Sequence, residues 1–457
     1  MYGSDFSDRQ KLKDADRRFI WRPFTQMQDY VLEEPVIIAK GDGVYLEDID
    51  GVRYLDGFAS MWCNVHGHRV PEIDAAIRAQ LDAVAHTTLL GLSSVPAIRL
   101  AERLVEIAPP GLTRVFYSDD GATAVEVAVK MAFQYWRQRR DPKSAKTKFV
   151  RLEASYHGDT LGAISVGGIE TFHAAYGPLL FESIPAPAPY RYRCSACAQQ
   201  PACTEACSDA LENLFRERSD EIAAVILEPL VQAAAGMVVH PPGYLKRVAD
   251  LCKRYEVLLI ADEVATGFGR TGRMFACEHE GVTPDLLCLA KGLTGGYLPL
   301  AATLTTDEVY NAFLGDYAER KTFFHGHTYT GNPLGCAAAL ANLDLLQKEG
   351  FWEDLDRRIR LLADGLRRFR DLPHVGEVRQ CGVMVGIELV RDRATREPYP
   401  WEERIGVRVC AEARGRGLLL RPLAHVIVLL PPLSIGDAEM ERMLGITHRS
   451  IREVTER

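Results

Sequence analysis

The sequence predicts an α/β protein with two parts: a large domain built on a mainly parallel sheet, and a small α+β domain formed by both chain ends. From about Pro71, short apolar runs alternate with longer amphipathic stretches, which is typical of a parallel sheet covered by helices on both faces. Residues 36–57 alternate apolar and polar side chains around a central Asp-Gly pair, which predicts a β-meander or hairpin. After Asn332 the pattern is mostly helical until residues 417–433, where apolar runs and prolines predict short strands.

Within the large domain, six apolar runs are predicted strands, namely residues 113–118, 148–154, 222–229, 257–263, 285–291 and 300–306. Three amphipathic stretches are predicted helices, namely residues 71–84, 122–138 and 244–255. These elements assign residues 1–70 and 332–457 to the small domain and residues 71–331 to the large domain.

Composition excludes several classes of protein. With 457 residues, of which 47% are hydrophobic, the chain is long enough for about two or three domains and apolar enough to fold. The formal net charge is −8, whereas nucleic-acid-binding modules carry a basic excess, so we expect no nucleic-acid partner. No apolar run approaches the ~18 residues of a membrane helix, and residues 1–18 lack the apolar core of a secretion signal. We therefore expect a soluble cytoplasmic protein without a membrane partner.

Cysteine usage agrees with a reducing compartment, except in one segment. Seven of the 11 cysteines are scattered along the chain, which does not suggest a secreted disulfide framework. The other four, Cys194, Cys197, Cys203 and Cys207, have the spacing C-x2-C-x5-C-x3-C, from which four thiolates could bind one tetrahedral zinc ion. Reduced thiols or a local disulfide in a surface insertion are the alternatives, and we assign no metal.

A possible anion site follows the first predicted strand of the large domain. Residues 118–123 (SDDGAT) end this strand and begin a helix, so backbone N–H groups around Gly121 and Ala122 could bind a phosphate. An ordinary N-cap turn, in which Asp and Thr cap the helix, explains the same residues. Because α/β sheets place ligands at the ends of their strands, other strand ends are the next places to search.

Asp262 and Lys291 follow two further buried strands and complete a recognisable combination. A buried acid needs a partner, which is either a salt bridge or cap, or a cationic ring nitrogen. Most lysines are solvated surface charges, but desolvation behind a buried strand lowers the pKa of the amine and makes it nucleophilic. A phosphate site, an acid and a lysine, in this order, are what pyridoxal phosphate requires. The 29-residue step from Asp262 to Lys291 leaves room for one crossover helix between neighbouring strands.

A family resemblance supports this combination. Residues 258–310 (LLIADEVATGFGRTGRMFACEHEGVTPDLLCLAKGLTGGYLPLAATLTTDEVY) resemble the signature of class III (ω-type) aminotransferases, which are pyridoxal-phosphate enzymes of fold type I. The resemblance extends from Trp21 to about Pro432. The stretches that narrow it to the biotin-pathway members of the class are WRPFTQM (21–27), WCNVHGHRVPEI (62–73), YHGDTLGAISVGG (156–168) and FFHGHTYTGNPLGCAAA (323–339).

For the cofactor, the resemblance implies a role for each of four residues. Lys291 would bind pyridoxal phosphate as a Schiff base and then move a proton between the substrate carbon and the cofactor. Asp262 would keep the pyridine nitrogen protonated. Gly121 and Ala122 would bind the phosphate through backbone N–H groups. The loop reads DDGAT where the family often has Ser on both sides of the Gly, and the site survives this change because its donors are mainly backbone groups.

For the substrates, the resemblance implies a second group of residues. Tyr156 would lie on the cofactor ring and touch substrate, and Arg421 would bind the distal carboxylate of a keto acid through a bidentate pair. Trp62, Phe24 and Gly326 would line the substrate channel. Without the resemblance, the three aromatic residues read as ordinary core packing and Arg421 as a structural ion-pair residue.

The implied reaction is a ping-pong amino transfer to 8-amino-7-oxononanoate, which gives 7,8-diaminononanoate. The donor is adenosylmethionine or lysine, because Phe24 and Met61 replace a Tyr and a Trp of the best-known adenosylmethionine-using members. Thr328, beside His327, would reach the cofactor phosphate of the other subunit, which implies a homodimer. Glu228 ends a strand near the cofactor and receives no role.

Two alternative functions are considered. One is a broad-specificity ω-amine or β-amino-acid aminotransferase. The other is a non-catalytic pyridoxal-phosphate regulator, but such proteins carry a DNA-binding domain, for which residues 1–20 are too few.

Overall fold

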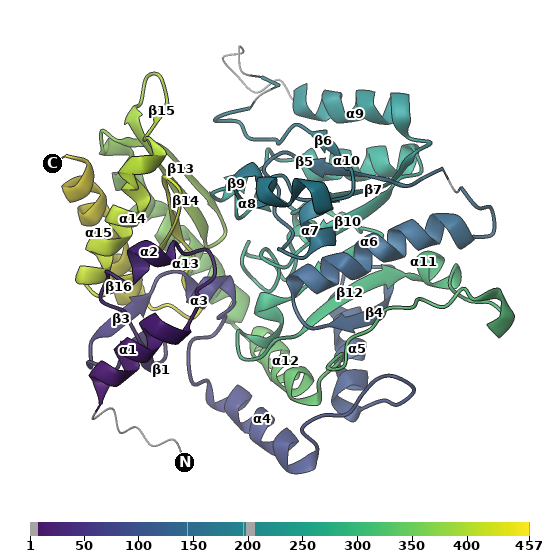
Figure 1. Ribbon diagram of the computed structural model, residues 1–457, viewed down its shortest axis with the longest axis horizontal. Helices are drawn as coiled ribbons and strands as arrows, with labels where there is room; N and C mark the ends of the chain where they lie inside the picture. The colour runs from purple at the N-terminus through teal and green to yellow at the C-terminus, as the bar shows by residue number, and fades with distance from the viewer. Residues whose placement is uncertain (1–7, 144, 195, 198–205, 457) are drawn as a thin grey trace.

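The computed structural model describes residues 8–143, 145–194, 196–197 and 206–456 (Figure 1). A seven-stranded sheet forms the centre of the large domain, with strand order β4-β12-β11-β10-β7-β5-β6. Its strands are β4 (Leu112–Ser118), β5 (Lys148–Leu152), β6 (Ile184–Ala186), β7 (Ile222–Leu227), β10 (Leu258–Asp262), β11 (Leu286–Leu289) and β12 (Ala301–Thr306). Only β12 runs antiparallel to its neighbours, so the predicted mainly parallel sheet and all six predicted strands are confirmed.

Helices cover both faces of this sheet because its strands are buried on both sides. In β10, for example, Ile260 belongs to one apolar cluster with α6 (Gly121–Gln138), whereas Leu259 belongs to another with α10 (Tyr244–Arg254). The other helices of this part of the chain are α4 (Pro71–Ala83), α5 (Val95–Ile107), α7 (Leu161–Ser165), α8 (Glu170–His173), α9 (Ala206–Arg218) and α11 (Asp307–Asn311). The three predicted helices therefore correspond to α4, α6 and α10.

Both chain ends contribute to the smaller sheets, as predicted. The strands β1 (Ile38–Asp42), β2 (Tyr45–Asp48) and β3 (Arg53–Asp56) form the predicted meander, and β16 (Leu418–Leu419) joins it in parallel beside β3. A second sheet contains β13 (Val375–Cys381), β14 (Met384–Asp392), β18 (Val426–Leu429) and β17 (Arg421–Leu423), with β15 (Glu397–Pro398) paired to β14. The accompanying helices are α1 (Arg9–Phe19), α2 (Met27–Tyr30), α12 (Pro333–Leu346), α13 (Phe351–Leu366), α14 (Ile405–Gly415) and α15 (Asp437–Thr455).

The structure differs from the expected secondary structure in two places. The stretch from Asn332 to residue 417 is mostly helical, as expected, but it also contains the β13–β14 hairpin, which was not predicted. The first seven residues of β14 are all buried, so the strand shows no apolar–polar alternation, and a continuous apolar run cannot be told from a buried helix. The connection from Asp262 to Lys291 also contains no α-helix; a single 3-10 turn, Ala276–Glu280, is its regular structure before β11.

The domain boundaries at residues 70 and 331 stay a prediction. Helix α12 follows the second boundary, yet it packs against α4 and α5 of the preceding segment. Among the described residues, no helix combines the length and the apolar character needed to cross a membrane.

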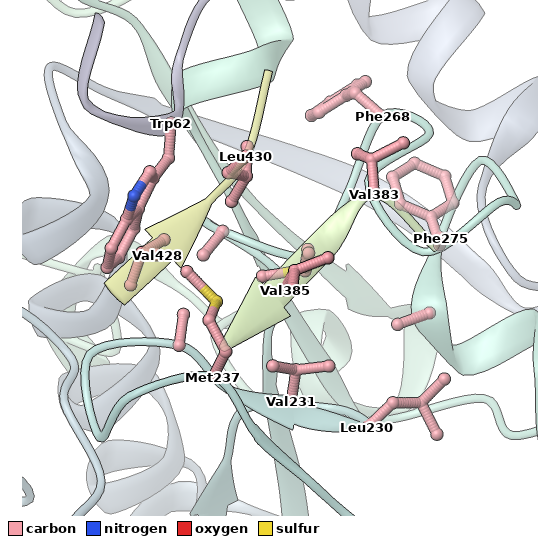
Figure 2. Close-up of a cluster of buried hydrophobic side chains, with 14 of the residues drawn as sticks. Trp62, Leu230, Val231, Met237, Phe268, Phe275, Val383, Val385, Val428 and Leu430 are labelled. Atoms are coloured by element: carbon pink, nitrogen blue, oxygen red, sulfur yellow. The ribbon is translucent and has the colours of Figure 1, made fainter. Parts of the chain in front are cut away.

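An apolar cluster joins the sheet of β14 and β18 to the large domain (Figure 2). Val385 of β14 and Val428 of β18 belong to the same buried cluster as Met237 and Trp62. Figure 2 shows the Trp62 side chain beside Val428 at the edge of this cluster. The position of Trp62 therefore depends on the packing of the small domain against the large one.

The buried side chain of Arg270 also stabilises this contact between the small and the large domain. Its side chain is 1% exposed and donates to the carbonyls of Trp62 (3.2 Å), Asn64 (2.7 Å) and Pro431 (3.1 Å). Burial lowers the pKa of the guanidinium to about 10, so the group is still charged at neutral pH. Two of these carbonyls belong to residues 62–64 and the third to residue 431, so one buried side chain holds together two segments that are far apart in sequence.

We predict that Arg270→Met destabilises the protein strongly. The change leaves three acceptors without a donor, and each buried polar group left unpaired costs about 1–3 kcal/mol, so we expect a loss of roughly 3 kcal/mol or more. Urea unfolding followed by circular dichroism measures this loss. Arg273→Met, which removes an exposed arginine three residues away, is the matched control and should stay within about 0.5 kcal/mol of the parent. Equal midpoints for the two variants would show that Arg270 carries no structural role.

Candidate active site

A cavity of about 720 Å³ opens at the carboxyl ends of the parallel strands. Such edges are where open α/β sheets bind ligands. Six of the residues predicted from the sequence line this cavity: Trp62, Gly121, Ala122, Tyr156, Asp262 and Lys291. Five others do not line it: Phe24, Gly326, His327, Thr328 and Arg421.

Asp262 ends β10 with its carboxylate buried in this cavity. The side chain is 4% exposed, and its two oxygens lie 2.7 Å from His157 Nδ1 and 3.0 Å from the backbone nitrogen of Val264. His157 was not predicted as a site residue, although it follows Tyr156 directly in the sequence. The neighbouring acid Glu263 points away and accepts backbone hydrogen bonds from Ala276 (2.7 Å) and Cys277 (2.8 Å). Of the acidic pair, only Asp262 is available to a ligand.

Lys291 follows β11 and brings an amine into the same cavity. Burial lowers the pKa of this amine, and the nearby carboxylates of Asp262 and Glu228 oppose the shift. Its Nζ lies 5.3 Å from the centre of the Trp62 ring. Lys291 adopts a φ of 45°, a left-handed conformation that non-glycine residues rarely adopt. A desolvated lysine of this kind is a good amine nucleophile and proton acceptor.

The beginning of α6 is a helix cap and also a candidate anion site. Asp120 and Thr123 form a capping box, in which the Asp120 carboxylate accepts from the Thr123 nitrogen at 2.9 Å. The N–H groups of Gly121 and Ala122 belong to the first turn of the helix, where backbone donors have no acceptor within their own helix, and both residues line the cavity. A Cβ on Gly121 would lie 2.5 Å from the Val264 side chain, so the close approach here requires glycine. The two interpretations of this loop are therefore compatible.

Glu228, which had no role in the sequence analysis, holds the backbone around the cavity. It ends β7, is buried, and accepts from the backbone nitrogens of Tyr156 (3.1 Å) and Ala233 (2.8 Å). Burial is the main cause that raises the pKa of Glu228 to about 7; the nearby His157 opposes this shift and the Asp262 charge adds to it. Glu228 thereby fixes the turn that carries Tyr156 against the turn at Ala233.

Tyr156 lines the cavity and hydrogen-bonds to a second acidic side chain, that of Asp159. Its hydroxyl donates to Asp159 Oδ2 at 2.7 Å, and burial raises the pKa of the phenol. The Tyr156 ring stacks on His173, with ring centres 6.2 Å apart and an angle of 18° between the planes. Asp159 also lines the cavity, which gives the site a carboxylate that sequence reasoning missed.

Trp62 reaches the cavity from a left-handed turn. The four residues of α3 (Ala59–Trp62) all have positive φ values between 47° and 72°. Each such residue costs about 1–2 kcal/mol without compensation. Asp56 compensates by accepting from the backbone (3.0 Å) and the hydroxyl (2.8 Å) of Ser60, and Arg270 holds the Trp62 carbonyl. The strained turn places the indole above Lys291.

Phe24 and Arg421 lie next to each other outside the cavity lining. The Arg421 guanidinium is 6.0 Å from the centre of the Phe24 ring, and this ring packs edge-on against Phe172 at 5.2 Å. Phe172 in turn contacts Tyr156, with ring centres 6.3 Å apart. Burial lowers the pKa of Arg421, and within the described residues no carboxylate lies at ion-pair distance from it. The aromatic side chains thus connect Arg421 to the cavity.

The segment from Gly326 to Thr328 lies outside its own chain's cavity. Thr328 is exposed, and His327 Nδ1 lies 2.9 Å from Asp119 Oδ2. A contact of Thr328 with the phosphate of another subunit stays a prediction.

The cysteine segment is only partly described. Cys194, Cys197 and Cys207 are buried, whereas Cys203 lies outside the described residues. In the described part of the chain, no group of three or more His, Cys, Asp or Glu side chains is arranged to hold a metal ion. The four-cysteine hypothesis stays open.

The donors around the cavity fit pyridoxal phosphate. Helix N–H groups for a phosphate, a desolvated amine for the aldehyde carbon and a buried carboxylate for the ring nitrogen share one cavity. Two buried polar atoms that face it, His157 Nε2 and Trp62 Nε1, have no hydrogen-bond partner among the described residues. Buried polar atoms without partners are rare in proteins and indicate that a ligand or water completes the site.

Comparison with known proteins gives the same family. The model of the family described as aminotransferase class-III matches residues 27–451. A curated relative from Geobacter sulfurreducens, named adenosylmethionine-8-amino-7-oxononanoate aminotransferase, is 56% identical over 98% of this chain and 99% of its own length. The crystal structure of the protein with this name from Methanocaldococcus jannaschii has a TM-score of 0.92 and 48% identity, over 98% of this chain and 99% of that one.

A solved (S)-enantioselective ω-transaminase from Thermomicrobium roseum also has a TM-score of 0.92, with 37% identity over 98% of this chain and 99% of its own. These likenesses confirm the predicted fold class, and they agree with a cavity whose donors suit pyridoxal phosphate. The chain belongs to the class III aminotransferases and is a pyridoxal-phosphate-dependent enzyme.

Proposed function

We propose that this enzyme converts 8-amino-7-oxononanoate into 7,8-diaminononanoate, with adenosylmethionine as the amino donor. The observation that carries the proposal is the placement of two opposite charges around the cavity. Asp159 lines it, and Arg421 is joined to it through aromatic contacts. Within the described residues, neither side chain has an oppositely charged partner at ion-pair distance. A substrate with an ammonium group near the reacting carbon and a carboxylate at its far end matches this pattern.

The residues of the chain have distinct tasks in this reaction. Gly121 and Ala122 hold the cofactor phosphate, and Asp262 holds the proton of the ring nitrogen. Lys291 Nζ takes a proton from the amine-bearing carbon and returns one to the acceptor, which its lowered pKa favours. When bound, pyridoxal phosphate supplies an electron sink for the charge left on that carbon. Tyr156 covers the site and helps to exclude water.

We also propose a cytoplasmic homodimer in which Thr328 completes the partner's cofactor site. The exposure of Thr328 outside its own cavity supports this arrangement. Nearby apolar side chains are also exposed, including Leu90 (69%), Phe324 (76%) and Tyr329 (60%), which is the surface expected of a subunit contact. Buried cysteines such as Cys277 suit a reducing compartment.

Arg421 distinguishes this proposal from a general ω-transaminase, the activity named for the solved relative from Thermomicrobium roseum. We predict that Arg421→Ala weakens binding of 8-amino-7-oxononanoate by roughly 2–5 kcal/mol, because it removes the partner of a buried carboxylate. Steady-state kinetics with this substrate give the change in KM and kcat/KM. Arg408→Ala, an exposed arginine on α14, is the control and should behave like the parent. Unchanged binding by the Arg421 variant, or no activity of the parent on this substrate, would favour the general ω-transaminase.

The amino donor is tested in a half-reaction. We predict that adenosylmethionine, added alone to the loaded enzyme, converts the bound cofactor to its amino form and shifts its visible absorbance. The Trp62 ring stabilises the sulfonium group of adenosylmethionine through a cation–π contact worth about 0.5–2 kcal/mol. Phe24 and Met61 give the donor no polar contact. Lysine is the comparison donor, and Lys291→Ala is the control that should react with neither. Conversion of the cofactor by lysine but not by adenosylmethionine would overturn the assignment of adenosylmethionine as the donor and leave the aminotransferase assignment standing.

A further inference from the structure

The segment 323–330, here called the HGH loop, is fastened to the strand and helix that flank its own chain's phosphate site. The Thr330 hydroxyl donates to the carbonyl of Tyr117 on β4 at 2.6 Å. His325 Nδ1 lies 3.0 Å from Lys130 Nζ on α6. The anion site is the turn between β4 and α6, so both contacts connect the HGH loop to the elements that build it.

A third contact comes from the anion site itself. Asp119 lines the cofactor cavity, one residue before the cap of α6, and its Oδ2 lies 2.9 Å from His327 Nδ1. His327 is followed by Thr328, which is exposed and does not line the cavity of its own chain. Asp119, at the phosphate site of its own chain, therefore contacts His327. The next residue, Thr328, would complete the phosphate site of the other subunit in the proposed dimer.

We propose that the Asp119–His327 pair couples the two cofactor sites of the dimer, so that filling one site strengthens cofactor binding in the other. The inference rests on the proposed function, because it requires Thr328 to complete the partner's site. A phosphate dianion at the start of α6 repels the Asp119 carboxylate and favours its contact with the His327 imidazole. A fixed His327 holds Thr328 in place, which lowers the entropy that the partner's site loses when it binds its own phosphate.

Asp119 and His327 act here as positioning residues. Their side chains are 37% and 25% exposed, and polar contacts with this exposure add little to global stability. Removing the pair should therefore leave the unfolding temperature unchanged and alter the relation between the two sites. A merely structural pair would show the opposite pattern, with a lower unfolding temperature and unaltered coupling.

The test is a titration of the cofactor-free dimer with pyridoxal phosphate. Equilibrium dialysis measures bound cofactor, and sedimentation confirms that the protein is a dimer. In the parent, we expect the second site to bind on the order of 5-fold more tightly than the first, or more, within the usual range of coupling between sites. Asp119→Asn and His327→Asn should each make the two constants equal, and the double variant should match the single ones. Asp437→Asn, which removes a surface ion pair with Arg357 at 2.7 Å, is the control and should keep the coupling.

Thr328→Ala separates failure of this inference from failure of the proposed function. A dimer whose cofactor affinity falls in this variant has the shared site that the proposed function requires. Given such a dimer, two results would overturn the inference and leave the proposed function standing. One is that the two sites of the parent bind pyridoxal phosphate with equal constants; the other is that Asp119→Asn and His327→Asn both keep the coupling. If Thr328→Ala binds cofactor like the parent, or if the parent is a monomer, the shared site is absent and both are overturned.

Discussion

The buried carboxylate of Asp262 is the constraint on which the rest of the site depends. It stands at the end of a strand whose residues are all buried, where an ionised group is costly unless it is paired and hydrogen-bonded. His157 and the backbone of Val264 satisfy its oxygens, and its charge raises the pKa of Lys291 against the effect of burial. A protonated ring nitrogen supplies the positive partner that this environment favours. The same carboxylate therefore organises the protein side of the cavity, and we propose that it also keeps the cofactor reactive.

The architecture brings the chemical groups together by two routes. The parallel sheet places the ends of β4, β7, β10 and β11 along one edge, so that residues distant in sequence share one cavity. The proposed substrate side is assembled differently, from a left-handed turn at Trp62 and the small-domain strand that begins at Arg421. Arg270 joins these two parts by holding the carbonyls of Trp62 and Pro431. The cofactor side thus depends on one sheet, whereas the substrate side depends on how the two domains pack.

This difference explains what the sequence could predict. Apolar runs of strand length, followed by Gly, Asp or Lys, predicted the central sheet, and the structure brings Asp262 and Lys291, which follow two of these runs, into one cavity. The β13–β14 hairpin was missed because β14 is buried on both faces and shows no alternation. His157, Asp159 and Arg270 act through tertiary contacts that leave no periodic signal, and only a family motif around Tyr156 pointed to the first two. The proposed role of Thr328 depends on a second chain, about which neither residue spacing nor the structure of one subunit gives information.

The most direct test of this account is the protonation state of the cofactor ring. The cofactor-free enzyme is loaded with pyridoxal phosphate that carries an NMR-active nitrogen isotope in the ring, and the ring-nitrogen resonance is recorded at neutral pH. The account predicts a protonated nitrogen in the parent and an unprotonated one in Asp262→Asn, with both proteins folded and loaded. A deprotonated ring in the parent, or a ring that stays protonated in the variant, would contradict the claim that the buried Asp262 charge controls the site.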